Sequence, residues 1–159
     1  MTAAFIGVGA NLGDPRAQVL AAIGALGKIE DSSLQAVSSL YRSEPQGFAQ
    51  QPDFINAVAE IETALAPRAL LDALLAIERA WGRERSFANA PRTLDLDLLL
   101  YGDRVIDEPG LRVPHPKMHQ RAFVLAPLAE IAPKASIPGF GPIAPLLAAC
   151  ASQKMEILE

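Results

Sequence analysis

Residues 90–100 read Ala-Pro-Arg-Thr-Leu-Asp-Leu-Asp-Leu-Leu-Leu and predict a buried β-strand that carries two acids. Successive side chains of a strand point to opposite faces, so Asp95 and Asp97 share one face. The opposite face is expected to carry Leu94, Leu96, Leu98 and Leu100. Two neighbouring carboxylates repel each other unless positive charge lies between them. The strand therefore suggests a cation site, and the alternative is an edge strand whose acids face water.

The elements before this strand give the order β-α-β-β-α-β. The patterns predict strands at 3–9, 34–42 and 54–62, a helix from about Pro15, and a helix from Pro67 that ends at Gly82. This order is typical of the split β-α-β arrangement, in which an antiparallel four-stranded sheet carries both helices on one face. We therefore expect the α+β class with a ferredoxin-like core, in which residues 95–100 form the fourth strand.

The residues after Tyr101 are expected to be helical additions to this core. A turn is predicted at 102–103, and apolar helices are predicted near 123–131 and 143–150. The chain has 159 residues, enough for one ordinary domain and too few for two. We expect residues 1–159 to form a single domain.

The composition of the chain excludes some classes of binding partner. The net charge is −4, which leaves no basic surface for a nucleic-acid backbone. The N-terminus lacks a signal peptide pattern, and no stretch reaches the roughly 18 apolar residues of a membrane span. We expect a cytoplasmic protein that binds neither nucleic acid nor membrane. The single cysteine, Cys150, lies in an apolar setting and is expected to be buried and inert.

An arginine-rich loop precedes the acidic strand. Arg83, Arg85 and Arg92 lie between Gly82 and the acids. Carboxylates that bind magnesium, together with arginines that bind phosphate oxygens, match the charge pattern of a bound nucleoside triphosphate. A solvated loop whose arginines pair with the nearby acids is the alternative.

The two histidines and the N-terminal glycines give weaker signals. His115 and His119 are four residues apart, but Pro116 makes a continuous helix through both unfavourable, which argues against a zinc pair. In the turn after Pro114, His115 can donate to a phosphate with Arg121 nearby, or it can be purely structural. The glycines at positions 7, 9 and 13 favour a tight strand-to-helix turn over a dinucleotide site, because an antiparallel sheet is expected.

A third signal concerns a planar ligand. Aromatic rings can stack on a flat heterocycle while an amide pairs with its edge. Phe54, Asn56 and Phe123 could build such a pocket, although both phenylalanines would be ordinary core residues in most proteins.

Taken together, the motifs resemble the 6-hydroxymethyl-7,8-dihydropterin pyrophosphokinase family over nearly the whole chain. The matching stretches are Gly9-Ala10-Asn11-Leu12-Gly13, Tyr41-Arg42-Ser43-x-Pro45-x-Gly47, Gln51-Pro52-Asp53-Phe54-x-Asn56, Pro91-Arg92-Thr93-Leu94-Asp95-Leu96-Asp97, Val113-Pro114-His115-Pro116 and Arg121-x-Phe123-Val124-Leu125. The segment from Pro91 to Asp97 is the most diagnostic of them.

The resemblance implies transfer of pyrophosphate from ATP to the hydroxymethyl group of 6-hydroxymethyl-7,8-dihydropterin in folate biosynthesis, with release of AMP. Asp95 and Asp97 would hold two magnesium ions. The implied catalytic residues are Arg83, Arg92, Asp95 and Asp97, and the implied ATP contacts are Glu78, Arg83, Arg85, Arg92, His115 and Arg121. The implied pterin contacts are Ser43, Glu44, Gln46, Phe54, Asn56 and Phe123, with Phe54 and Phe123 on the two ring faces. We expect a monomer and name no general base.

Two features depart from the family pattern. The loop before Pro91 reads Ser86-Phe87-Ala88-Asn89 where some relatives carry a basic residue and a tryptophan, and Glu44 stands where relatives have other side chains. A ferredoxin-like regulatory module without catalysis is the alternative function, since a fold by itself does not define an activity. The loops at 43–53 and 82–92 are expected to close over substrates.

Overall fold

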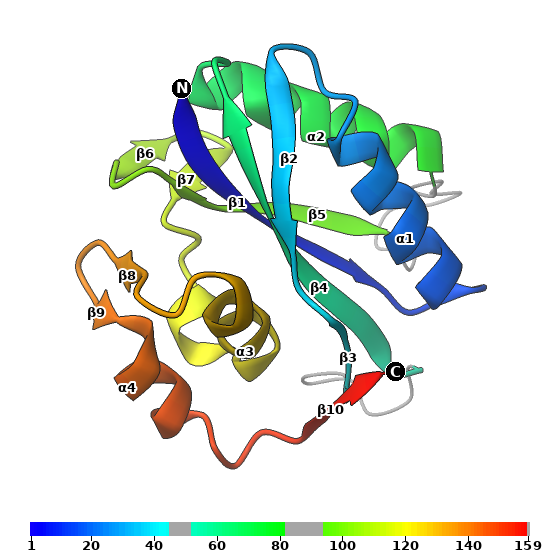
Figure 1. The fold of residues 1–159 in the computed structure, drawn as a ribbon, viewed down its shortest axis with the longest axis vertical. Helices are drawn as coiled ribbons and strands as arrows, with labels where there is room; N and C mark the ends of the chain where they lie inside the picture. The colour runs from blue at the N-terminus through cyan, green and yellow to red at the C-terminus, as the bar shows by residue number, and fades with distance from the viewer. Residues whose placement is uncertain (45–51, 82–93, 159) are drawn as a thin grey trace.

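The computed structural model describes residues 1–44, 52–81 and 94–158. Within these ranges one six-stranded sheet has the order β10-β3-β4-β1-β5, and β2 also pairs with β4 (Figure 1). Its strands are β1 (Thr2–Ala10), β2 (Ser32–Val37), β3 (Leu40–Ser43), β4 (Phe54–Thr63), β5 (Asp95–Tyr101) and β10 (Met155–Leu158). All the pairings in this sheet are antiparallel, which confirms the ferredoxin-like α+β core.

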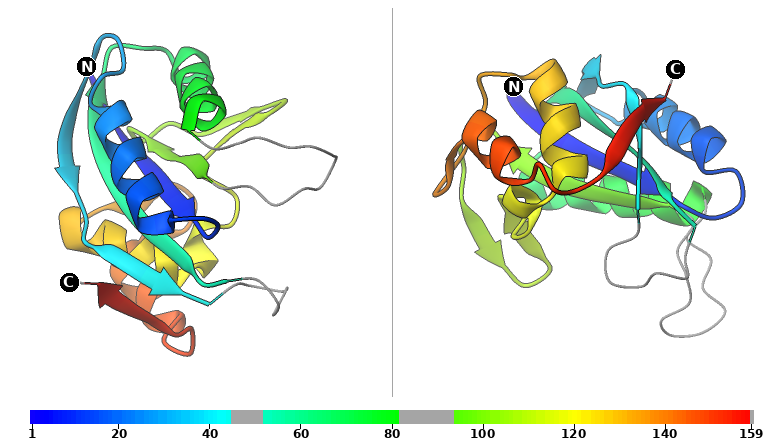
Figure 2. Two further views of the ribbon diagram at one scale, coloured as in Figure 1. Left: turned by 90° about the vertical axis from the view of Figure 1, so that its right-hand side faces the viewer. Right: turned by 90° about the horizontal axis from the view of Figure 1, so that it is seen from below.

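Helices cover both faces of the sheet, as Figures 1 and 2 show. The core helices α1 (Pro15–Leu26) and α2 (Pro67–Trp81) lie on one face, and the additions α3 (Ala122–Ile131) and α4 (Ile143–Ala149) lie on the other. Small elements connect them: β6 (Ile106–Glu108), β7 (Leu111–Val113), the 3-10 helix η1 (Met118–Gln120), β8 (Ser136–Ile137) and β9 (Gly141–Pro142). No helix within the described ranges is long and apolar enough to span a membrane.

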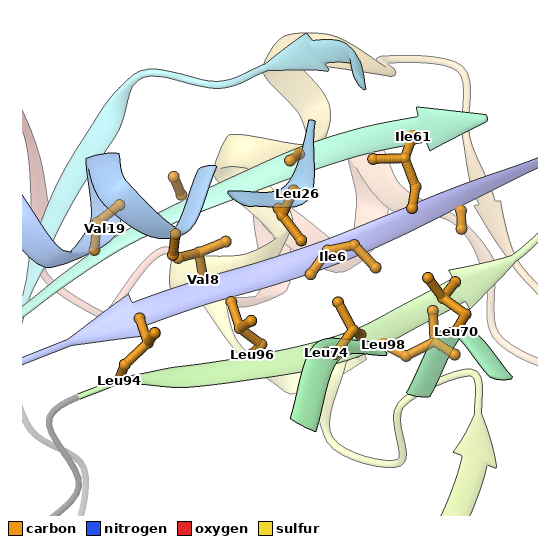
Figure 3. Packing of buried hydrophobic residues seen from close by; sticks show 14 of the residues in the cluster. Ile6, Val8, Val19, Leu26, Ile61, Leu70, Leu74, Leu94, Leu96 and Leu98 are labelled. Carbon is orange, nitrogen blue, oxygen red and sulfur yellow. The ribbon is translucent and has the colours of Figure 1, made fainter. Parts of the chain in front are cut away.

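The larger core lies between the sheet and the first two helices. Ile6 and Val8 of β1 lie beside Leu96 of β5, and Leu74 of α2 and Val19 of α1 pack over them (Figure 3). α1 begins where the sequence predicts, because the Asp14 carboxylate accepts a hydrogen bond from Ala17 N at 3.2 Å ahead of a proline at the first helical positions. This face of the sheet is therefore a filled hydrophobic layer.

One predicted face assignment is wrong. Leu98 pairs with Ile6 but Leu100 pairs with Phe5, so β5 contains one extra residue opposite β1. This bulge reverses the alternation, because a single inserted residue turns all later side chains to the opposite face. Leu100 therefore packs with Leu99 against the α3 side, whereas Leu94, Leu96 and Leu98 face α1 and α2 as predicted.

The strand predicted at 34–42 is divided into β2 and β3. Ser38 separates them: its backbone N–H donates to Val58 O at 2.9 Å, and its hydroxyl accepts from Val58 N at 2.9 Å. The serine side chain thus takes the place of a backbone acceptor and interrupts the ladder. Beyond the expected helices, the C-terminal strand β10 also joins the sheet, beside β3.

Candidate active site

A cavity of about 230 Å³ lies on the sheet face that α3 covers. Its walls come from β1, β4, β5, the end of β3 and the start of α3. Residues of its lining that the sequence predicts as functional are Ser43, Glu44, Phe54, Asn56, Asp95, Asp97, Arg121 and Phe123. The fold therefore brings the acids and the aromatic rings to the same space from segments that lie far apart in the sequence.

The two acids lie opposite two glycines of β1. Asp95 pairs with Gly9 and Asp97 pairs with Gly7, and both glycines also line the cavity. A Cβ atom at Gly9 would lie 3.0 Å from Asn56 Oδ1, a contact tight enough to push the amide aside. The missing side chains leave room beside the carboxylates.

The amide of Asn56 is held in a defined orientation. Asn56 Nδ2 donates to Ser43 Oγ at 2.7 Å, and both side chains are buried. Because one amide hydrogen is used by Ser43, the remaining donor and the carbonyl oxygen can serve a ligand. This arrangement suits recognition of the edge of a polar heterocycle.

An aromatic ring and a guanidinium group approach the cavity from α3. The Arg121 guanidinium carbon lies 5.4 Å from the centre of the Phe123 ring, within the range of a cation–π contact. Phe54 lines the same cavity from β4. The lining of the cavity thus combines two aromatic rings, from β4 and from α3, with one positive charge.

His115 lies next to the second acid. Its Nε2 is 4.0 Å from Asp97 Oδ1, and its Nδ1 accepts a hydrogen bond from Lys117 N at 3.2 Å. Burial, followed by the positive charges of Arg121 and Lys117, lowers the pKa of His115 from 6.5 to about 4. The imidazole is therefore neutral at physiological pH and carries its proton on Nε2, toward Asp97. His119 instead stacks on Phe140, with ring centres 3.9 Å apart.

A second hollow of about 400 Å³ lies beside β5 and β7. It is lined by Leu71, Leu96, Asp97, Leu98, Gly110, Leu111, Arg112, His115 and Pro116. Asp97 lines both cavities, so the two spaces share this residue of β5. The sequence patterns do not predict Arg112 and Leu71 as residues of a site. Residues 106–113 show no strong strand pattern, and Leu71 fits the ordinary apolar stripe of a helix.

Glu78 supports the acidic strand from α2. The side chain is buried, and Oε2 accepts a hydrogen bond from Leu96 N at 2.7 Å. This contact places Glu78 at the backbone of β5 between the two acids. A direct contact of Glu78 with a nucleotide stays a prediction.

Four of the predicted site residues lie outside the described residues. They are Gln46, Arg83, Arg85 and Arg92. The two loops that are expected to close over substrates, 43–53 and 82–92, also lie largely outside the described residues.

An antiparallel α+β sheet with paired carboxylates and two adjoining cavities defines a small-molecule-binding domain of the ferredoxin-like class. The chain belongs to the 7,8-dihydro-6-hydroxymethylpterin-pyrophosphokinase (HPPK) family, whose sequence profile matches residues 5–133.

Two relatives illustrate this membership. The 2-amino-4-hydroxy-6-hydroxymethyldihydropteridine pyrophosphokinase of Pseudomonas aeruginosa is 49% identical over 154 residues, which cover 97% of this chain and 95% of the relative. The Haemophilus influenzae protein of the same name is 44% identical over 155 residues, covering 98% and 97% of the two chains.

Solved structures agree in fold. A crystal structure of HPPK-DHPS in complex with substrates superposes with a TM-score of 0.73 at 11% identity, over 94% of this chain and 45% of that chain. Wild-type Plasmodium falciparum HPPK-DHPS with SDX-DHP gives a TM-score of 0.72 at 13% identity, over 94% and 43%. This chain thus spans less than half the length of those structures, and the likeness concerns the fold alone.

Proposed function

We propose that Asp95 and Asp97 hold two Mg²⁺ ions while the chain carries out the activity of its family, the transfer of a pyrophosphoryl group from ATP to the hydroxymethyl group of 6-hydroxymethyl-7,8-dihydropterin. The observation that carries this assignment of the site is that Asp97 lines both cavities. The cavity under α3 has features that suit a planar heterocycle. The hollow beside β5 and β7 is lined by the neutral His115 and by Arg112. The family activity needs both substrates to meet at one point.

The acids fit the proposed metal. Mg²⁺ prefers oxygen ligands and is commonly bound by one or two carboxylates together with substrate phosphates. Asp95 and Asp97 supply the carboxylates, and Gly7 and Gly9 leave space beside them. When bound, Mg²⁺ neutralises charge on the phosphate oxygens and helps to orient them.

The pterin is proposed to occupy the cavity under α3. Phe54 and Phe123 would contact its two ring faces, and Asn56 would bind its edge while Ser43 orients the amide. Glu44 also lines the cavity and can contribute its side chain or its backbone. Gln46 is proposed to add a contact from the adjoining loop.

ATP is proposed to occupy the hollow beside β5, where Leu71, Leu98 and Leu111 offer an apolar surface. His115 Nε2–H and Arg121 are proposed to donate to phosphate oxygens near Asp97, which lies 4.0 Å from the His115 ring nitrogen. Arg83, Arg85 and Arg92 are proposed to bind further phosphate oxygens from the arginine-rich loop, and Glu78 is proposed as an additional nucleotide contact.

The reaction needs orientation more than a strong base. The pterin hydroxyl oxygen attacks the β-phosphorus, the bond from that phosphorus to the α–β bridging oxygen breaks, AMP leaves, and the hydroxyl proton passes to solvent. Placement and charge neutralisation supply most of the rate enhancement in such displacements. Since both proposed sites lie within one chain, we propose that the active species is a monomer. We also propose that it acts in the cytoplasm.

The test is product analysis. Incubation with ATP, Mg²⁺ and 6-hydroxymethyl-7,8-dihydropterin should give AMP and the pterin pyrophosphate in equal amounts, measured by ³¹P NMR. Formation of ADP would indicate ordinary phosphoryl transfer instead. Substrate binding without nucleotide turnover would support a regulatory module.

A further inference from the structure

The start of α3 is held by a residue from the C-terminal segment. Ala122 N donates to Gln153 Oε1 at 2.9 Å, and Gln153 Nε2 donates to Gln120 O at 2.7 Å. One amide side chain thus binds the backbone on both sides of Arg121. Arg121, at the N-cap position of α3, makes no side-chain capping bond itself.

This contact replaces an ordinary helix cap. The first N–H groups of a helix have no partner within the helix and require one from elsewhere. Gln153 supplies an acceptor to the N–H of Ala122, the first of α3, and also a donor to the carbonyl of Gln120, two residues earlier. Only a side chain with both a donor and an acceptor can do this, and among uncharged side chains of this length glutamine is the one that presents both on a planar amide.

The residues held in this way face the proposed pterin cavity. Arg121 and Phe123 lie on either side of Ala122 and both line that cavity. The cation–π contact between them ties the guanidinium group to the ring. A shift of the backbone at Ala122 would therefore move the ring and the charge together.

The segment that carries Gln153 is itself anchored to the sheet. A turn bond from Gln153 N to Cys150 O at 2.9 Å fixes its start, and β10 follows beside β3, as Figures 1 and 2 show, with Met155 opposite Ser43. Met155 also packs against the same hydrophobic cluster as Phe123. Gln153 thus connects the strand that ends at Ser43 with the helix that begins at Ala122.

We propose that Gln153 is a positioning residue for the pterin site, which sets Arg121 and Phe123 against the cavity by holding the backbone between them. The inference rests on the proposed function. Its effect is expected on pterin binding, because neither Gln153 nor β10 lines the hollow proposed for ATP.

The test compares steady-state kinetics of Gln153→Met with the wild type. The substitution keeps the length of the side chain and removes the donor and the acceptor. We expect the KM for the pterin to rise about tenfold and the KM for MgATP to change less than about threefold. Faster amide hydrogen exchange over residues 120–124 should accompany the change and does not require turnover.

Two controls separate positioning from general loosening. Gln35→Met makes the same substitution at an exposed residue whose amide binds Ser33, and it should leave both KM values unchanged. Tyr41→Phe removes the hydroxyl bond to Glu130 at the other end of α3 (2.6 Å), and it should leave the KM for the pterin near the wild-type value. Gln153→Glu keeps the acceptor and the size, and serves if the methionine variant does not fold.

The outcomes are distinct. A pterin KM in Gln153→Met that equals that of Gln35→Met, or an equal rise in Tyr41→Phe, would overturn the inference. If the methionine variant does not fold, an unchanged pterin KM in Gln153→Glu would overturn it as well. If the wild type forms no AMP, the proposed function fails, and unchanged exchange at 120–124 in Gln153→Met would then overturn the positioning role independently.

Discussion

Asp97 lines both the proposed pterin cavity and the hollow proposed for ATP. Its side chain is 46% exposed, which means that it contributes little to the core. An exposed acid beside another acid has an electrostatic cost, so its expected role is in binding and not in folding. Removing it should affect turnover far more than folding.

Asp97→Ala tests this role. We expect kcat to fall about a hundredfold or more, because a ligand of the proposed metal is lost, while the midpoint of urea unfolding stays close to the wild-type value. Asp72→Ala, at an exposed position of α2, is the matched control and should remain active. Full activity of Asp97→Ala would show that the metal assignment is wrong.

His115 gives a pH prediction. Its pKa is about 4 in the folded chain and 6.5 when unperturbed, so the unfolded chain binds the extra proton between these values. The folded chain favours the neutral imidazole, and the contribution of His115 to the free energy of unfolding is therefore fully present above about pH 6.5. This contribution is lost as the pH falls toward 4. We expect the free energy of unfolding to decrease over this range, and to decrease less steeply in His115→Asn. Identical slopes in the two proteins would contradict the shifted pKa.

At the scale of elements, β5 is an edge strand of the sheet and still carries both acids. An edge strand leaves backbone groups unpaired on its outer side. The buried carboxylate of Glu78 binds one of them, Leu96 N, and so ties the strand to α2. This contact lies between Asp95 and Asp97 and helps to fix the backbone from which both project.

Glu78→Ala should lower the free energy of unfolding by about 1–3 kcal/mol, because a buried N–H loses its acceptor. Glu78→Gln retains an oxygen acceptor and should lose less, as measured by urea titration of both variants. Equal stability of the alanine variant and the wild type would contradict this structural role. A raised KM for ATP in a fully stable Glu78→Gln would instead support the additional nucleotide contact.

At the scale of the whole molecule, the sheet is shared by two hydrophobic clusters, one under α1 and α2 and one under α3 and α4. Unfolding of either helical layer would expose apolar side chains of the same strands. We therefore expect one cooperative thermal transition for residues 1–159, the same by fluorescence and by circular dichroism, with a midpoint that rises when MgATP is present. Two separate transitions would show that the C-terminal helices form an independent unit.

The local patterns of the sequence were sufficient for much of this architecture. Alternation predicts β4, whose Ile55 and Ile61 lie in the core, and proline positions predict the starts of both core helices. The order of these elements then leads to an antiparallel ferredoxin-like sheet, because few connections are compatible with it. Such features depend on neighbours in sequence, and a periodic pattern carries that information.

Other features were decided only by tertiary structure. The extra residue at Leu99 turns Leu100 toward α3, β10 pairs with β3, and Gln153 holds the start of α3. Each depends on contacts between residues distant in the chain, which no local periodicity records. The sequence by itself determined β1, β4 and β5, the helices and the paired acids. The folded chain decided which residues support the site, since buried backbone groups must find partners wherever the packing brings them.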